Sequence, residues 1–162
     1  MNLEDSIENI LDIVNECLEK EKNDPNGLLS HVKTIIPEYN NERGVEAPAI
    51  WIVQHTVSRK GNDNLSQELL LMFTIEFVCV EWDKTPKIAE KKARRLATKV
   101  AESIKRNYRR IQIEKNLYII ENVLFNTLYP VGEIEVEGKT TKTPVSGLVL
   151  DFEFNIDWNN RC

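Results

Sequence analysis

The sequence is poor in the residues that usually build catalytic and cofactor sites. Its 162 residues include only two histidines, and its six glycines form neither a G-x-G-x-x-G pattern nor a phosphate-binding loop. Its three cysteines lie far apart, with no C-x-x-C pair, which excludes a disulfide framework and fits a reducing compartment. No nucleotide-binding or disulfide-stabilised fold is therefore expected.

The sequence also lacks a hydrophobic run that is long enough to span a membrane. The most apolar stretch, residues 69–82, is shorter than a bilayer requires and lies next to charged residues. The N-terminus, M-N-L-E-D-S-I-E, is acidic and periodic, which is unlike a signal peptide. We therefore expect no membrane partner.

What the sequence does have is a strong strand signal in the stretch L-L-L-M-F-T-I-E-F-V-C-V-E-W at 69–82. Strand side chains alternate, so one face would be wholly apolar, and the other face would be mostly apolar, with Thr74 on it and an interruption by Glu76. A helix is the rival interpretation of so apolar a run, but the β-branched and aromatic residues of its second half favour a strand. We expect a central strand that helices cover on one side.

Two helices are expected, one before this strand in the sequence and one after it. Apolar residues recur at helical spacing over residues 3–22, and the turn-forming sequence N-D-P-N-G at 23–27 ends the first helix. The second begins with Thr85 as N-cap and Pro86 in its first turn, and it ends near Asn107. A narrow stripe of alanine, leucine and valine along this second helix predicts that it lies close on a sheet.

The remaining elements are strands and their connections. We expect a short piece at 28–36, a loop at 38–47, strands at 49–58, 111–125, 133–137 and 148–158, and a polar, mobile segment at 139–143. The strand at 49–58 precedes turn-forming residues and then the apolar stretch 69–82. The simplest connection between these two strands is a long antiparallel hairpin.

This order of elements predicts an α/β fold of the α+β sandwich type. We expect a largely antiparallel sheet of four or more strands with two main helices packed on one face. A chain of this length can bury a substantial core, so residues 1–162 are expected to form a single domain.

Charge is divided very unevenly along the chain. Between Lys84 and Arg110 there are eleven lysines and arginines and two glutamates, so this segment carries +9 and the rest of the chain −14, within a net charge of −5. The cations lie on the second helix, where a solvated helix face explains them as well as a binding surface does. As a binding surface, they would contact an acidic subunit or nucleic-acid phosphate.

Candidate chemical residues are scattered through the sequence. His31 and His55 have no neighbouring residues at metal-ligand spacing, so neither is assigned a role. Four carboxylates on expected strands would form a metal site only if the fold brought them together: Glu76, Glu121, Asp151 and Glu153. A metal-dependent nuclease therefore stays open as an alternative, as does a nucleic-acid-binding module that uses the basic helix at 84–110. No catalytic, metal or cofactor-binding residue is assigned.

The pattern of elements resembles the tail terminator, or tail completion, proteins of long-tailed bacteriophages and prophages. The resemblance covers nearly the whole chain and rests on the N-terminal helix, P-A-I-W-I-V near residue 50, F-V-C-V-E-W-D, A-x-x-x-A-x-x-L-A-x-x-V and the final G-L-V-L-D-F-E-F-N-I-D-W. It implies a non-enzymatic α/β minor tail protein without cofactors. Such proteins form hexameric rings that cap the tail tube and join it to the head connector.

The resemblance also implies partners and a location. The partners would be further copies of this chain, the tail tube protein and the head–tail connector protein. Weak contact with DNA is also compatible with a position between tail and head. The protein would lie in the virion tail and, during assembly, in the host cytoplasm. We expect oppositely charged lateral surfaces to join the subunits, with these interface residues: Lys91, Arg94, Arg95, Asp151 and Glu153. Loops at 38–47, 59–66 and 129–146 are candidates for contact with the tube and connector.

Overall fold

The computed structural model describes six backbone ranges. They are residues 3–36, 45–59, 68–107, 117–125, 129–136 and 139–157. Side chains are described for residues 8, 11–36, 46–52 and 75–107.

Helix α1 spans Leu3–Asn23, which confirms the first predicted helix. It ends where the backbone N–H of Asp24 bonds the Lys20 carbonyl at 3.1 Å and a tight turn follows. In that turn the Asp24 side chain accepts a hydrogen bond from the Asn26 N–H at 2.9 Å. The Gly27 N–H bonds the Asp24 carbonyl at 2.8 Å. Aspartate, asparagine and glycine thus end the helix through local hydrogen bonds, as the sequence predicted.

The sheet begins with a short strand and a long hairpin. Strand β1, Thr34–Ile36, pairs in parallel with β3, Ala49–Arg59. Strand β3 pairs antiparallel with β4, Glu68–Val80, with a register shift between Ile52 and Gln54. The predicted hairpin is confirmed, and β4 ends at Val80, two residues before the end of the apolar stretch.

Helix α2 spans Pro86–Arg106, which confirms the second predicted helix. Thr85 occupies the N-cap position and Pro86 the first turn, as predicted, although the Thr85 side chain makes no capping hydrogen bond. Instead the Thr85 N–H donates to Asp83 Oδ1 at 3.0 Å, because Asp83 folds back beside the chain before the helix starts. At the other end the Asn107 side chain donates to the Ser103 carbonyl at 2.7 Å and caps the helix.

The C-terminal part differs from the prediction in where its strands begin. The described strands are β5 Leu117–Phe125, β6 Tyr129–Val136 and β7 Lys139–Asp157. The segment 139–143, expected to be mobile, is the first part of β7 and pairs with β6. The loop expected at 129–146 is therefore a β-hairpin over most of its length. Its valine, isoleucine and threonine residues are β-branched and suit a strand, although threonine is polar.

The loop expected at 38–47 also contains a short strand, β2, Val45–Glu46, which pairs in parallel with β6. Its earlier part lies outside the described residues. So do the predicted strand start at 111–116 and nearly all of the loop at 59–66.

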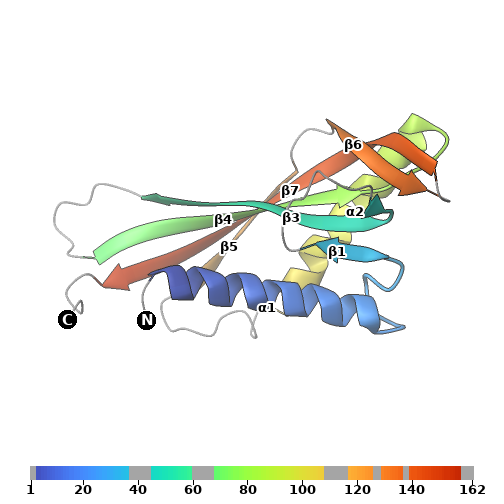
Figure 1. The fold of residues 1–162 in the computed structure, drawn as a ribbon. Helices are drawn as coiled ribbons and strands as arrows, with labels where there is room; N and C mark the ends of the chain where they lie inside the picture. The colour runs from blue at the N-terminus through green and yellow to red at the C-terminus, as the bar shows by residue number, and fades with distance from the viewer. Residues whose placement is uncertain are drawn as a thin grey trace.

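Over the described strands, backbone pairing follows the order β1-β3-β4-β7-β6-β2, and β5 also pairs with β7. Parallel and antiparallel pairs both occur, so the sheet is mixed. Figure 1 shows α1 running along one side of the strands. Two helices and a mixed sheet confirm the α+β class.

The main core lies between the helices and one face of the hairpin. Val14, Cys17 and Leu18 of α1 share it with Leu96 and Val100 of α2. The strands contribute alternate residues to it, as their two-residue period requires: Ile50, Ile52, Ile75, Phe77 and Cys79. Each fully buried large side chain, such as Phe77, contributes roughly 1.5–3 kcal/mol to stability.

The other face of the hairpin carries a second apolar cluster of Ala49, Trp51, Val78 and Val80. Strands β3 and β4 are therefore apolar on both faces in the part of the hairpin where β3 pairs with β1, as the stretch 69–82 indicated. Among the helices within the described ranges, none is long and apolar enough to cross a membrane.

Candidate functional site

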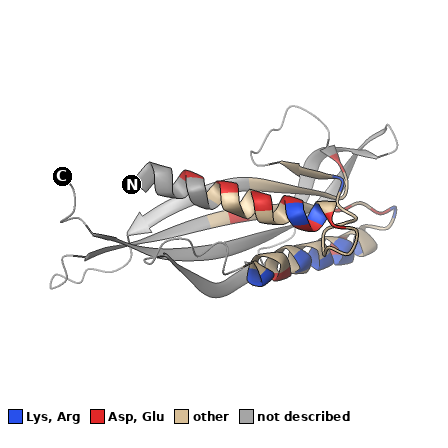
Figure 2. Cartoon of the chain, turned by 90° about the horizontal axis from the view of Figure 1, so that it is seen from below, with Lys and Arg blue, Asp and Glu red and all other residues tan. Residues whose placement is uncertain are grey.

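Helix α2 separates its residues into a buried stripe and a basic face. The buried stripe is largely alanine, which lets the backbone lie near the strands: Ala89, Ala93, Leu96, Ala97, Val100, Ala101, Ser103 and Ile104. Predicted interface residues Lys91, Arg94 and Arg95 are all exposed on the opposite side. We call these three residues the basic face. Figure 2 shows cations along α2 beside α1, which carries mainly acidic residues before its basic last turn.

The other two predicted interface residues lie on β7. Asp151 pairs with Thr74 and Glu153 with Met72, while Val149 pairs with Glu76. Directly paired residues share a sheet face, and residues two apart on a strand share it too. By register, Asp151 and Glu153 are thus on the face of Glu76 and Val78, opposite the face that meets the helices. Their side chains lie outside the described part of the chain.

The structure therefore groups the predicted interface residues into two sets. The three cations lie on the helix side of the sheet, and the two carboxylate residues belong to the other face. Within one chain the two sets are not brought together.

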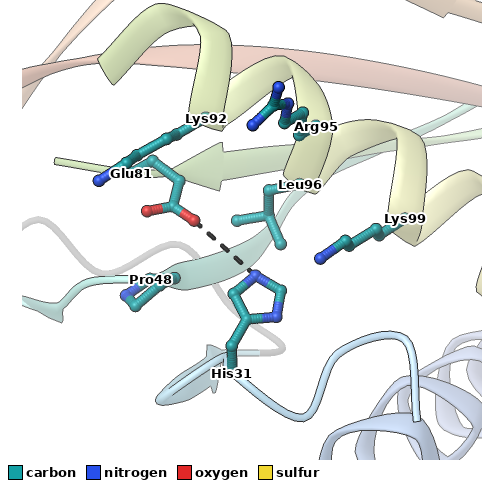
Figure 3. Close-up of a pocket in the computed structure, with 7 residues that line it drawn as sticks. All are labelled: His31, Pro48, Glu81, Lys92, Arg95, Leu96 and Lys99. Atoms are coloured by element: carbon teal, nitrogen blue, oxygen red, sulfur yellow. Dashed lines mark ion pairs between the residues drawn. The ribbon is translucent and has the colours of Figure 1, made fainter. Parts of the chain in front are cut away.

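A second feature, which the sequence did not indicate, is a hollow between α2 and the turn after α1. Its volume is about 330 Å³. We call it the His31 hollow. It is lined by His31, Pro48, Glu81, Lys92, Arg95, Leu96 and Lys99 (Figure 3). The turn supplies His31, and Glu81 directly follows β4. One side of α2 supplies the cations at spacings of three and four residues.

Glu81 is the buried acid of the His31 hollow, with 8% of its surface exposed. Its Oε1 lies 3.8 Å from His31 Nε2 (Figure 3). Burial raises the pKa of Glu81, and Lys92, Lys99 and a hydrogen bond from the Trp82 backbone oppose that rise. Burial and the positive charge of Lys99 lower the pKa of His31. Both groups are thus pushed toward their neutral forms.

The cations of the hollow differ in how they are paired. Lys92 Nζ contacts Asp83 Oδ2 at 3.0 Å. The Thr85 N–H, and after it Lys92, lower the pKa of Asp83. Within the described ranges, the side chains of Arg95 and Lys99 take part in no hydrogen bond and no ion pair. The hollow therefore holds two cations that form no close ion pair, although the charge of Lys99 acts on Glu81.

A third polar feature closes the corner where both helices end. Glu21 is 6% exposed, and its Oε2 accepts a hydrogen bond from the Leu28 N–H at 3.0 Å. Arg106 of α2 reaches the same oxygen at 3.5 Å. These contacts tie the turn and the end of α2 to α1, and we call them the Glu21 corner.

Of the four carboxylate residues weighed for a metal site, only Glu76 has a described side chain, so that site stays a prediction. Glu76 is on β4, and Glu121 falls at the register shift of β5 between Ile120 and Val123. His55 pairs with Ile75 in the β3–β4 hairpin. Among the residues whose positions are described, no three histidine, cysteine or acidic side chains are grouped as metal ligands.

The sequence contained only part of the signal for the His31 hollow. The spacing of Lys92, Arg95 and Lys99 places them on one side of a helix. His31 and Glu81 are fifty residues apart, and no local pattern joins them. Only the packing of the turn against α2 brings them together.

Comparison with known proteins leaves the chain without a family assignment. Neither a scan against family models nor a search of curated proteins finds a match. Function must therefore be argued from the residues.

Proposed function

We propose that this protein is a structural tail protein of a phage or prophage, a tail terminator whose subunits form a ring. The proposal includes the finer form of the predicted fold, a largely antiparallel sheet of four or more strands with two helices packed on one face. The antiparallel pairs β3–β4 and β4–β7 and the shared core of α1 and α2 support it.

One observation carries the proposal: surfaces of unlike charge belong to opposite sides of the chain. The basic face of α2 is on the helix side, while Asp151 and Glu153 belong by register to the other sheet face. A head-to-tail contact joins two different surfaces of successive subunits and closes a ring when the rotation allows. Complementary charge on those two surfaces would set the order and register of the subunits.

In this proposal the protein is not an enzyme and needs no cofactor. Its partners are further copies of itself in a hexamer, the tail tube protein and the head–tail connector protein. Its location is the virion tail, after assembly in the host cytoplasm. The β6–β7 hairpin, which replaces the expected loop at 129–146, is a candidate contact with the tube or connector.

The test is a charge-swap experiment read by mass in solution. Light scattering after size exclusion would follow the wild-type chain, Arg94→Glu/Arg95→Glu, Asp151→Lys/Glu153→Lys and the combination of all four changes across a concentration series. We expect each double variant to assemble more weakly than the wild type, and the fourfold variant to recover assembly because its two surfaces are again complementary. Arg94 and Arg95 are exposed.

Two controls make the result specific. Lys20→Glu/Lys84→Glu changes the charge by the same amount at exposed residues outside the basic face, and it should assemble like the wild type. Circular dichroism of every variant should match the wild type. Weak assembly of both double variants without recovery in the fourfold variant would reject the charge pairing. If the wild type stays monomeric, the same variants are compared for attachment to isolated tail tubes, and equal attachment by all would reject the ring.

The basic face also supports a second function, binding to nucleic acid. Exposed cations on one helix suit phosphate contacts, whose affinity falls steeply with salt. DNA binding that is steeply salt-dependent and lost in Arg94→Glu/Arg95→Glu, but unaffected by Asp151→Lys/Glu153→Lys, would favour this function over the ring. Cleavage that requires a divalent metal would favour the nuclease alternative instead.

A further inference from the structure

We propose that the His31 hollow is a binding site for an oxyanion, a phosphate or carboxylate group carried by a small molecule. The site does not depend on the ring, because it is formed within one chain. Arg95 and Lys99 would contact the anion, and His31 would donate a further hydrogen bond from the opposite wall.

The first argument is convergence. His31 comes from the turn after α1, and the cations come from α2, so residues of separate elements line one hollow (Figure 3). Among the described residues the side chains of Arg95 and Lys99 form no ion pair, while neighbouring Lys92 is held by Asp83 at 3.0 Å. Two cations that no close ion pair occupies are thus available to a ligand. Arginine offers a planar pair of donors that matches phosphate and carboxylate.

The second argument is the balance of charge around His31. It faces Glu81 at the end of β4 and Lys99, Arg95 and Lys92 on α2. Lys99 and burial lower the pKa of His31, so the empty hollow favours the neutral ring. An anion between Lys99 and His31 would offset the positive charge and favour the imidazolium, which has two donors.

The third argument is size. A volume of about 330 Å³ lies at the small end of the range for ligand sites, and Leu96 and Pro48 supply an apolar wall. The hollow therefore suits a small molecule with one anionic group and a short apolar part. An extended chain of phosphates would require a longer surface.

The chain offers a direct probe because it contains only two histidines. Their imidazole resonances can be followed by two-dimensional NMR and assigned with His31→Gln, while His55 serves as an internal control. The purified full chain would be titrated with inorganic phosphate, pyrophosphate and succinate at constant ionic strength. We expect a saturable shift of the His31 resonance and a rise in its pKa with at least one of these anions. Preference for a phosphate or for succinate would identify the class of anionic group.

Three variants assign the binding to the hollow. Lys99→Gln lies outside the predicted ring interface, and we expect it to weaken the binding about tenfold, as loss of a charged hydrogen bond predicts. Arg95→Gln should have a similar effect. Lys105→Gln removes an exposed cation of the same helix outside the hollow and should bind like the wild type. Amide spectra would verify that each variant is folded.

The proposal fails if none of the three anions produces a saturable shift at His31. It also fails if His55 moves with the same dependence on anion concentration, or if Lys99→Gln and Arg95→Gln bind as tightly as Lys105→Gln. Failure here would leave the ring proposal intact, because the charge swap is read by assembly and not by anion binding.

Discussion

The Glu21 corner and the His31 hollow each contain a buried glutamate, but the two carboxylates have different surroundings. Glu21 accepts a backbone hydrogen bond from Leu28 at 3.0 Å and lies near Arg106 in a corner that the turn closes. Glu81 lies 3.8 Å from His31 beside a hollow that contains surplus cations. The first arrangement satisfies a carboxylate with groups of the fold itself, as a structural contact does. The second leaves cations unused, as a binding site does.

The comparison shows that burial of a charged residue does not by itself mark a site. Both carboxylates are similarly buried, at 6% and 8% exposure. What differs is whether the groups around them are already paired. Substitutions in the two regions should therefore have different consequences. Those in the Glu21 corner should lower the free energy of unfolding most.

The largest effect is expected from Gly27→Ala. A Cβ at Gly27 would collide with the backbone carbonyl oxygen of Glu21, which cannot rotate away as a side chain would. We expect a loss of about 3 kcal/mol in the free energy of unfolding, measured by urea denaturation. Asn26→Ala is the control, because only its backbone N–H bonds in the turn, and it should lose much less. Equal losses in the two variants would show that the turn is not closely packed on α1.

A matched pair of substitutions compares the two carboxylates directly. Glu21→Ala leaves the Leu28 N–H without its acceptor and should cost about 2 kcal/mol. Glu81→Ala also removes the acceptor of the Trp82 backbone, but it should cost less, about 1 kcal/mol, because burial already disfavours the charge of Glu81 and the open hollow admits water. Urea denaturation near neutral pH measures both. A larger loss for Glu81→Ala would reverse the assignment of the two regions.

The smallest effect is a pH dependence due to His31. Its pKa is lower in the folded chain than the ordinary value of 6.5, so below that value the unfolded chain binds more protons. His31 therefore reduces stability as the pH falls through and below 6.5. The raised pKa of Glu81 acts in the opposite direction, since the folded chain then binds the extra proton as the pH falls toward 4.5.

The measurement is the difference in unfolding free energy between wild type and His31→Gln at about pH 7.5 and about pH 5.5. We expect His31→Gln to gain on the wild type at the lower pH, since it removes the group that takes up a proton on unfolding. His55→Gln should not show the same gain if the effect belongs to the hollow. A difference that does not change with pH would mean that the surroundings of His31 leave its protonation unaffected.

The sequence predicted the local elements well where their signal was periodic. The first helix, the hairpin and α2 appear close to their expected bounds, because alternating or helical spacing of apolar residues specifies which face is buried. The segment 139–143 was misjudged because polar threonines look like a loop when read alone. Pairing with β6 makes it part of β7.

Site residues were predictable only where one element contains them. Lys91, Arg94 and Arg95 were expected on an exposed face because helical spacing separates them from the alanine stripe. The position of Asp151 opposite the helix side required the register of β7 on β4, which the sequence does not specify. The His31 hollow required two residues far apart in the sequence to meet.

The amino-acid sequence by itself determined two amphipathic helices, a hairpin strand with apolar residues on both faces, and the concentration of positive charge on α2. It could do so because the spacing of apolar residues and the local density of charge depend only on residues that are close together in the sequence. Tertiary structure alone decided which carboxylate is closed in a corner and which lies beside a hollow with unpaired cations. The reason is physical: pairing, burial and pKa depend on distances between side chains, and packing rather than sequence separation sets those distances.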